Sequence, residues 1–344
     1  MSVQSLSAER RFMFLIVCAL GALVALGAIA PAAFDSAAVP PRVHAETAAP
    51  RSIELPAIQA PPPGALIQPV LATNIARRFP ELHLTPPAQS ILADKQIVSY
   101  YGNPYTADMG ILGSADPETI AELPEQRAQE YDRLNGSMGV VPALHLVYAV
   151  AQYHEADDGL YLQYVDENEV DEYVRIAEEH DMLLFLDLQI GRSSVETEMR
   201  KVLPYLRNPL VHLALDPEFA VAVGEVPGTD LGSLRGLDIN YAQQALAGLV
   251  ERESLPPKLL MVHQFVDSMV LDGNAIERYA NVDLTIDMDG FGPAAIKRVK
   301  YEQYASRSYA AHSAIKLFLL HDPDLMSAQE VLALEPTPSV IIYQ

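Results

Sequence analysis

Tryptophan is absent from the 344-residue chain, and cysteine occurs once, as Cys18 in an apolar run near the N-terminus. A single thiol cannot form an intramolecular disulfide, so the rest of the chain has neither a thiol nucleophile nor a cysteine-type metal site. Any aromatic surface in a binding site must come from the 16 tyrosines and 9 phenylalanines. The sequence also lacks a Gly-x-Ser-x-Gly segment, which makes a serine hydrolase the least favoured enzyme class.

Positive charge is scarce as well. The chain has 23 lysines and arginines against 45 aspartates and glutamates, a formal charge of −22. Without a basic stripe, the folded part is not expected to bind nucleic acid or an anionic membrane surface. Half of the residues are apolar, which is enough for a sizeable core in one large domain or two small ones.

The N-terminus has the order of an export segment. Arg10 and Arg11 precede an uninterrupted apolar run over residues 12–30, and small residues follow. The run is long enough to span a bilayer, so either a cleaved signal peptide or an uncleaved anchor fits, and both place the body outside the cytoplasmic membrane. We therefore expect an extracellular or cell-surface protein that touches the membrane only through this segment. The expected division is residues 1–30 export segment, 31–64 linker with eight prolines, 65–95 transitional segment and 96–344 folded domain.

From residue 96 onward, apolar segments alternate with helical patterns. The expected strands are Ile97–Tyr101, Val140–Val147, Leu183–Ile190, Val211–Phe219, Leu259–Phe265, Val282–Asp289, Ile315–Leu320 and Ser339–Tyr343. Eight strands alternating with helices predict a closed (β/α)₈ TIM barrel whose eighth strand ends the chain without a final helix. A doubly wound open sheet is the second choice, disfavoured because no glycine-rich phosphate loop follows the first strand.

Helices are expected at four places. One opens at Asp166 with a capping-box pattern, and two cover residues 240–252 and 294–307. A fourth, over residues 117–135, is expected to be broken at Pro124 and to stop at Gly136. The transitional segment is a candidate for closing the bottom of the barrel.

The segment Val211–Phe219 places two carboxylates at the mouth of the expected barrel. Its apolar residues fall on one face, while Asp216 and Glu218 fall on the other face, near the strand end. Pro217 cannot donate to a sheet ladder, so regular pairing should stop there. Two carboxylates that face one enclosed space repel each other and raise a pKa, which favours a functional role for Glu218.

Other strand ends are polar too. Tyr100 and Tyr101 end the first strand, His145 lies in the second, Asp187 and Gln189 end the third, His263 and Gln264 the fifth, Asp287 and Asp289 the sixth, and His321 with Asp322 the seventh. A single aspartate of this kind is as readily a helix cap, and a single histidine is more often an interior hydrogen-bonding group. Their recurrence at one end of the strands predicts a site there, because the active site of a TIM barrel lies at that end.

Asp216-Pro217-Glu218 resembles the Asp-x-Glu that ends strand four in chitinase-like and some lysozyme-like barrels, within the TIM-barrel glycoside hydrolases. The resemblance covers the architecture of residues 96–344 and this one motif. The chain departs from it at Ala214 and Val211, where the chitinase signature has aspartates, and at the end of strand one, where the lysozyme-like barrels have an aspartate. The resemblance implies a glycan substrate, with Glu218 as general acid and Asp216 as its orienting neighbour.

The second carboxylate is left open among Asp216, Asp187, Asp287 and Asp289. With no tryptophan, sugar stacking would fall to tyrosine and phenylalanine, including Tyr105. The candidate substrate-binding residues are Tyr100, Tyr101, Gln189, His263, Gln264, Phe291 and His321. Neither a metal nor another cofactor is expected.

Two other classes remain open. A metal-dependent hydrolase could use Asp187, Asp216, Glu218, His263, Asp287 and Asp289 as ligands, and loss of activity on chelation would reveal it. A non-catalytic barrel that binds a glycan or a partner would keep binding without turnover. The sugar, the linkage and the oligomeric state are not determined by the sequence.

Overall fold

The computed structural model describes residues 89–305 and 307–344. The predicted export segment, the proline-rich linker and most of the transitional segment lie outside these residues. Among the described helices, none combines the length and apolar character needed to cross a membrane.

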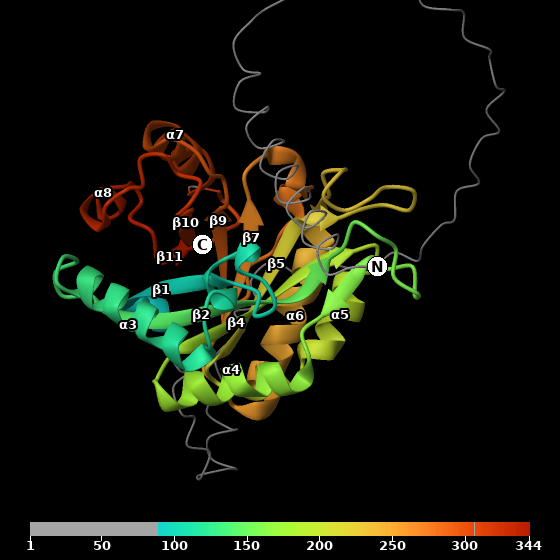
Figure 1. The fold of residues 1–344 in the computed structure, drawn as a ribbon, viewed down its shortest axis with the longest axis horizontal. Helices are drawn as coiled ribbons and strands as arrows, with labels where there is room; N and C mark the ends of the chain where they lie inside the picture. Colours follow the sequence, from blue (N-terminus) through green and yellow to red (C-terminus); the bar gives the residue numbers. More distant parts are fainter. Residues whose placement is uncertain (1–88, 306) are drawn as a thin grey trace, which may run out of the picture. The chain divides into compact units, whose positions relative to one another are not determined.

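The described chain forms a closed barrel of parallel strands (Figure 1). The eight strands are β1 (Lys95–Gly102), β2 (Gly139–Ala151), β4 (Leu183–Gly191), β5 (Val211–Ala220), β7 (Lys258–Gln264), β9 (Val282–Met288), β10 (His312–Leu317) and β11 (Val340–Tyr343). β1 pairs in parallel with both β2 and β11, which closes the sheet on itself. The predicted TIM barrel is confirmed, and all eight expected strands are present.

The barrel carries one additional antiparallel strand, and one of its eight strands is shifted from its predicted position. β3 (Leu162–Tyr164) pairs antiparallel with the long end of β2. β10 begins and ends three residues earlier than predicted. It ends at Leu317 because Phe318 begins a turn in which its N–H donates to the Asp322 carboxylate at 2.9 Å. The loop after this strand therefore starts at Phe318.

Alternation along each strand separates two apolar layers, as the period of two requires. On β5, Val211, Leu213 and Leu215 belong to the outer core between the strands and the helices. Ala214 belongs to a smaller cluster inside the barrel. The predicted facing of this strand is therefore correct, and it directs Asp216 inward.

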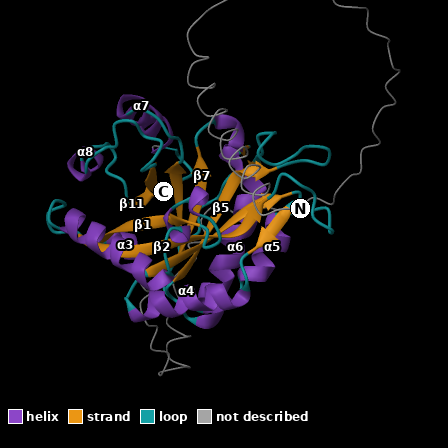
Figure 2. Ribbon diagram, viewed as in Figure 1, coloured by secondary structure: helices purple, strands orange, loops and turns teal. Residues whose placement is uncertain are grey.

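Helices cover the outside of the barrel (Figure 2). They are α3 (Pro117–Asp132), α4 (Glu167–Glu179), α5 (Val195–Val202), α6 (Gly236–Glu253), α7 (Ala294–Ala305) and α8 (Ala328–Leu332). Between β7 and β9 the connection has no α-helix and instead contains two 3₁₀ turns, Asp267–Met269 and Gly273–Ala275. Between these turns, β8 (Val270–Leu271) pairs with β6 (Leu234–Arg235).

The predicted break at Pro124 is wrong. α3 runs through Pro124 as one helix and ends at Asp132, before Gly136. Proline in a helix interior removes one backbone hydrogen bond. Here Pro124 lies on the buried face of α3 together with Ile120 and Tyr131, and this packing keeps the helix continuous.

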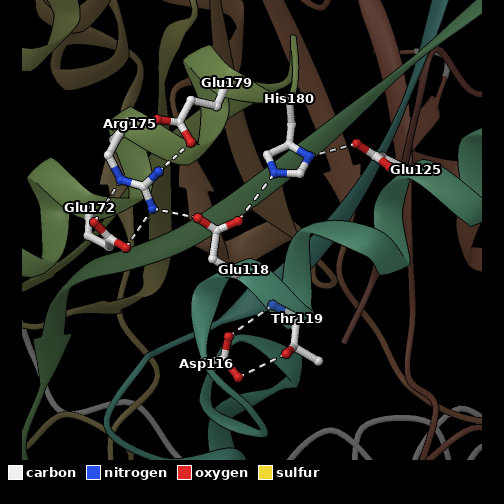
Figure 3. Close-up of polar contacts among 8 residues, drawn as sticks. All are labelled: Asp116, Glu118, Thr119, Glu125, Glu172, Arg175, Glu179 and His180. Carbon is white, nitrogen blue, oxygen red and sulfur yellow. Dashed lines mark hydrogen bonds and ion pairs between the residues drawn. The ribbon is translucent and has the colours of Figure 1, made fainter.

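α3 and α4 are also joined by charged side chains on their outer surface (Figure 3). The Arg175 guanidinium lies 2.7 Å from the Glu118 carboxylate, and His180 Nδ1 lies 2.8 Å from the Glu125 carboxylate. α4 begins at the expected N-cap, Asp166, whose carboxylate accepts the Asn168 N–H. Exposed pairs of this kind contribute about 0–1 kcal/mol each. The apolar layer beneath them therefore dominates the packing of the two helices.

The described end of the transitional segment packs against the N-terminal end of the barrel. A 3₁₀ turn, Ile91–Ala93, places Leu92 in the inner apolar cluster. The Ser90 hydroxyl donates to the Asp283 carboxylate at 2.5 Å, next to the first residue of β9. Apolar side chains thus fill the lower part of the barrel, and polar side chains are left for its other end.

Candidate active site

A cavity of about 190 Å³ lies at the carboxyl ends of the strands. Most of its lining belongs to strand ends and to the loops that follow them, the place where a TIM barrel carries its chemistry. Its polar lining includes Tyr101, Asn103, Gln189, Asp216, Glu218, Asp289, Lys297, Lys300, Lys316 and Gln344, and its aromatic lining also includes Tyr105, Tyr164, Phe219, Phe265, Phe291 and Phe318.

Asp216 and Glu218 line this cavity side by side. The regular pairing of β5 with β4 ends at Asp216, as expected from Pro217, and β5 continues for four more residues to Ala220, which pairs with Gly191 after a register shift. The Asp216 carboxylate accepts the Glu218 N–H at 3.2 Å and lies 3.4 Å from Gln189 Nε2, which donates to it. Asp216 is buried, whereas Glu218 is partly exposed.

Both carboxyls hold their protons unusually well. Burial raises the pKa of Asp216 to about 7, and the negative charges of Asp187 and Asp289 add to the effect. Burial also raises the pKa of Glu218, and the neighbouring Asp216 and Asp289 raise it further. The Glu218 carboxyl itself makes no hydrogen bond to the described residues, so it is available to a molecule in the cavity.

Below the cavity, Asp187 is the centre of a buried polar cluster. Its Oδ2 atom accepts the Tyr101 hydroxyl at 2.9 Å and lies 3.2 Å from His263 Nε2 and 3.5 Å from His145 Nε2. Burial raises the pKa of Asp187, but the two histidines lower it more, so its net pKa lies below the ordinary value. Burial lowers the pKa of His145 to about 4, which leaves this histidine neutral at neutral pH.

His263 bridges Asp187 to two further carboxylates. Its Nδ1 atom lies 2.8 Å from Asp287 Oδ2 and 3.3 Å from Asp289 Oδ2. Burial lowers the pKa of His263, but the Asp187 carboxylate and the hydrogen bond to Asp287 outweigh burial and hold it well above the ordinary value. Burial raises the pKa of Asp287, which has no exposed surface.

Lys316 is the second cation of the cluster, and sequence reasoning missed it. Its ammonium lies 3.0 Å from Asp289 Oδ2 and 3.6 Å from the centre of the Tyr101 ring. The side chain is almost fully buried, yet it also lines the cavity. A lone lysine between Ile315 and Leu317 in an apolar strand was the available signal, because an unpaired lysine is rarely buried.

The structure divides the predicted catalytic carboxylates into two groups. Asp216, Glu218 and Asp289 line the cavity, whereas Asp187 and Asp287 are completely buried and do not line it. The two buried residues can influence the cavity through the charges and hydrogen bonds of the cluster but cannot touch a ligand placed there.

The predicted substrate-binding residues divide in the same way. Tyr101, Gln189 and Phe291 line the cavity, and His263 lies beneath it. Tyr100 points to the outer core, where it stacks on Tyr343 at 5.5 Å between ring centres, because it follows the opposite parity from Tyr101.

Gln264 and His321 are also outside the lining. The Gln264 side chain lies on the other face from His263 and accepts the Tyr309 hydroxyl at 3.2 Å. His321 packs edge-on against Phe291, a residue of the lining, with 6.1 Å between ring centres. Neither is among the residues that line the cavity, and their predicted role in substrate binding stays a prediction.

Several lining residues carry no sequence signal of their own. Phe265, Phe318, Tyr164 and Asn103 come from loops or strand ends where an aromatic or amide residue is equally typical of the core or of a turn. Lys297 on α7 is buried and lies 3.0 Å from the Asp322 carboxylate. Lys297 lines the cavity because α7 packs over this end of the barrel.

Comparison with known proteins gives structural likeness alone. No protein-family model and no curated protein matches the chain. A GH18 chitinase from Pseudoalteromonas aurantia superposes with a TM-score of 0.36 at 10% identity, over 72% of this chain and 93% of the other. A hyperthermophilic endo-beta-1,4-glucanase gives 0.39 at 8% identity, over 74% and 92%. A sugar phosphate isomerase/epimerase from Parabacteroides distasonis gives 0.33 at 11% identity, over 72% and 85%.

Scores of this size place the chain in no family, so its own residues carry the functional argument.

Proposed function

We propose that the protein is an exported glycan-cleaving barrel in which Glu218 is the general acid. The observation that carries the proposal is the position of Glu218. It lines the cavity, its pKa is raised, and no side-chain hydrogen bond from the described residues engages its carboxyl. A carboxylic acid that stays protonated near neutral pH is the group that glycoside cleavage requires for its leaving oxygen.

Glu218 would donate its proton to the glycosidic oxygen as the bond to the sugar carbon breaks. Positive charge then develops on the sugar ring and needs a carboxylate beside it. Burial of Asp187 and Asp287 leaves Asp216 and Asp289 as the partners that a sugar in the cavity can reach. A carboxyl separation of about 5 Å implies a retaining reaction, and about 6.5–9.5 Å an inverting one.

The rest of the lining suits a carbohydrate. Tyr105 and Phe291 can supply faces for sugar rings in place of tryptophan, whereas the ring of Tyr101 is covered by Lys316. Asn103 and Gln189 add amide groups of the kind that bind hydroxyls. A cell-wall or other extracellular polysaccharide is the substrate class that we propose.

The test is turnover by Glu218→Gln on a glycan with a poor leaving group, after the parent has been screened on cell-wall and capsular glycans. Glutamine keeps the shape but cannot donate the proton, so the rate should fall by about 10²–10⁴ while binding changes little. Glu302→Gln, an exposed glutamate on α7, is the matched control and should keep parental turnover. Turnover by Glu218→Gln within a few-fold of the parent would refute the assignment.

The same experiment distinguishes glycan cleavage from a second candidate function, that of a non-catalytic barrel that binds a glycan. The cavity and its aromatic lining favour binding whether or not a reaction follows. Glycan binding by both the parent and Glu218→Gln, with no turnover of any glycan by either, would support that function instead.

Export is part of the proposal and depends on the residues before the barrel. Arg10 and Arg11 followed by the apolar run predict that the body lies outside the cytoplasmic membrane. A protease added to intact cells, after removal of any outer membrane, should digest the body. Complete protection would contradict export.

A further inference from the structure

Three ligand-type side chains converge beneath the cavity floor. His145 comes from β2, Asp187 from β4 and His263 from β7, and one ligand atom from each lies within 4.8 Å of the other two. All three residues are completely buried. They belong to different strands, so their meeting results from the barrel fold.

The two imidazoles are close to the carboxylate but do not form hydrogen bonds with it. Neither His145 Nε2 nor His263 Nε2 has a hydrogen-bond partner among the described residues, although they lie 3.5 Å and 3.2 Å from Asp187 Oδ2. Asp187 Oδ1 is likewise without a partner among them. Buried polar atoms without partners are rare, and each requires a physical explanation.

The spacing matches the ligand shell of a tetrahedral ion. Zinc binds imidazole nitrogen and carboxylate oxygen at about 2.0–2.2 Å, so two neighbouring ligand atoms of a tetrahedron lie about 3.3 Å apart. The two observed separations, 3.2 Å and 3.5 Å, lie on either side of that value. Ligands of one ion also point at the ion and not at each other, which explains why close atoms make no hydrogen bond.

Two of the three residues, His263 and Asp187, have the contacts that orient metal ligands, whereas His145 Nδ1 has no partner among the described residues. His263 Nδ1 lies 2.8 Å from Asp287 Oδ2, which leaves Nε2 for the shared point. The Tyr101 hydroxyl donates to Asp187 Oδ2 at 2.9 Å and holds that carboxylate in place. A histidine whose second nitrogen meets a carboxylate is the usual arrangement around a protein-bound zinc ion.

A second set of ligand-type groups, His263 with Asp287 and Asp289, is less suitable. The Lys316 ammonium already lies 3.0 Å from Asp289 and would repel another cation. His263 Nδ1 is also occupied by its contact with Asp287.

We propose that His145, Asp187 and His263 bind one divalent transition-metal ion, with zinc as the best match for two imidazoles and one carboxylate. Such a donor set suits zinc better than magnesium or calcium, which prefer oxygen ligands alone. The ion would tie β2, β4 and β7 together below the cavity. The site is distinct from Glu218 and does not depend on glycan cleavage.

The experiment is metal binding by the full chain. The purified protein is stripped with a chelator and titrated with Co²⁺, and bound metal is also counted by elemental analysis after loading with Zn²⁺. One equivalent of each ion and the intense visible absorption of tetrahedral Co²⁺ are expected. His145→Gln and His263→Gln should lose this binding, and Asp287→Asn should weaken it about 10–100-fold. His312→Gln, a histidine near the barrel's other end, is the matched control and should bind normally.

Absence of stoichiometric, tetrahedral Co²⁺ in the parent protein would overturn the proposal, whatever the variants do. Without a bound ion, His263 would be explained as an imidazolium that lies between the carboxylates of Asp187 and Asp287. Binding that survives both histidine substitutions, or that depends on Asp289 but not on His145, would also overturn it by placing the ion elsewhere. Because no readout involves turnover, failure here would leave the test of Glu218 unaffected.

Discussion

Replacing Lys316 by methionine should destabilise the protein strongly, because it removes a buried cation and leaves its partner charged. Lys316 and Asp289 are 3% and 9% exposed, and their charged atoms lie 3.0 Å apart. Methionine has nearly the same length and fills the space next to the Tyr101 ring. The change therefore tests charge more than volume.

The expected loss follows from the burial of the pair. Breaking a buried ion pair by removing one partner costs about 3–5 kcal/mol, because the remaining charge is left without compensation. A typical domain unfolds with only about 5–15 kcal/mol. The loss in Lys316→Met should therefore be a large fraction of the total free energy of unfolding.

Urea unfolding at neutral pH measures the effect. Asp289→Asn in the same chain removes the carboxylate that has lost its lysine partner, so the double variant should recover much of the stability that Lys316→Met loses. Lys95→Met is the control, because Lys95 and Asp94 form an exposed pair at 4.0 Å. That substitution should cost no more than about 1 kcal/mol.

A loss below about 1 kcal/mol in Lys316→Met, or no recovery in the double variant, would refute the electrostatic reasoning. A second measurement is independent of stability. Lys316 lowers the pKa of both Asp216 and Glu218. Its removal should therefore move the alkaline fall of glycan turnover to higher pH, and a shift to lower pH would contradict the same reasoning.

Further predictions concern pH and backbone packing. Because the pKa of Glu218 is raised above its ordinary 4.5, turnover should persist above the usual carboxyl range and fall as the acid ionises, which a pH–rate profile will show. The pKa of Asp216 rises from 3.8 to about 7, so native Asp216 binds more protons than the unfolded chain does between these values. Its contribution to stability is thus present below about pH 4 and is lost by about pH 7. Relative to the parent, Asp216→Asn should gain stability over that interval in urea titrations and level off above it. Gly113→Ala should destabilise the loop after β1, since a Cβ atom would lie 2.3 Å from the backbone carbon of Thr106. Gly136→Ala, where nothing lies within 4 Å, should cost only about 1 kcal/mol in thermal unfolding, from its positive φ of 79°.

The barrel was predictable because the pattern that identifies each strand is contained in one short segment of the sequence. Each strand alternates or runs apolar over a short segment, and each is followed by a turn or helix signal. On β5 the alternation was strict enough to orient Asp216 correctly. Pro124 misled the helix prediction, because a propensity rule acts on one residue while packing acts on the whole buried face of α3.

The cavity was less predictable than the barrel, because parity says which face a side chain occupies but not how deep it lies. Asp187 and Asp289 share the inward face, yet Asp187 is completely buried and Asp289 reaches the cavity. Tyr100 and Tyr101 are adjacent, and only the pairing of β1 decides which one points inward. The apolar strand around Lys316 indicated a buried lysine, but its partner Asp289, 27 positions away in the sequence, could be identified only from the structure.

The pKa of Glu218 is raised mainly by burial and is also influenced by the charged groups of the cluster below it. Five carboxyl groups, those of Asp187, Asp216, Glu218, Asp287 and Asp289, share this end of the barrel with His263 and Lys316. His263 contacts Asp187, Asp287 and Asp289, and Lys316 contacts Asp289. Neither cation forms an ion pair with Asp216 or Glu218 among the described residues. The two cations therefore compensate Asp187, Asp287 and Asp289 through direct contacts, whereas they act on Asp216 and Glu218 only at longer range. Burial and the charges of Asp216 and Asp289 outweigh the lowering effects of Lys316 and His263, so the pKa of Glu218 stays above its ordinary value.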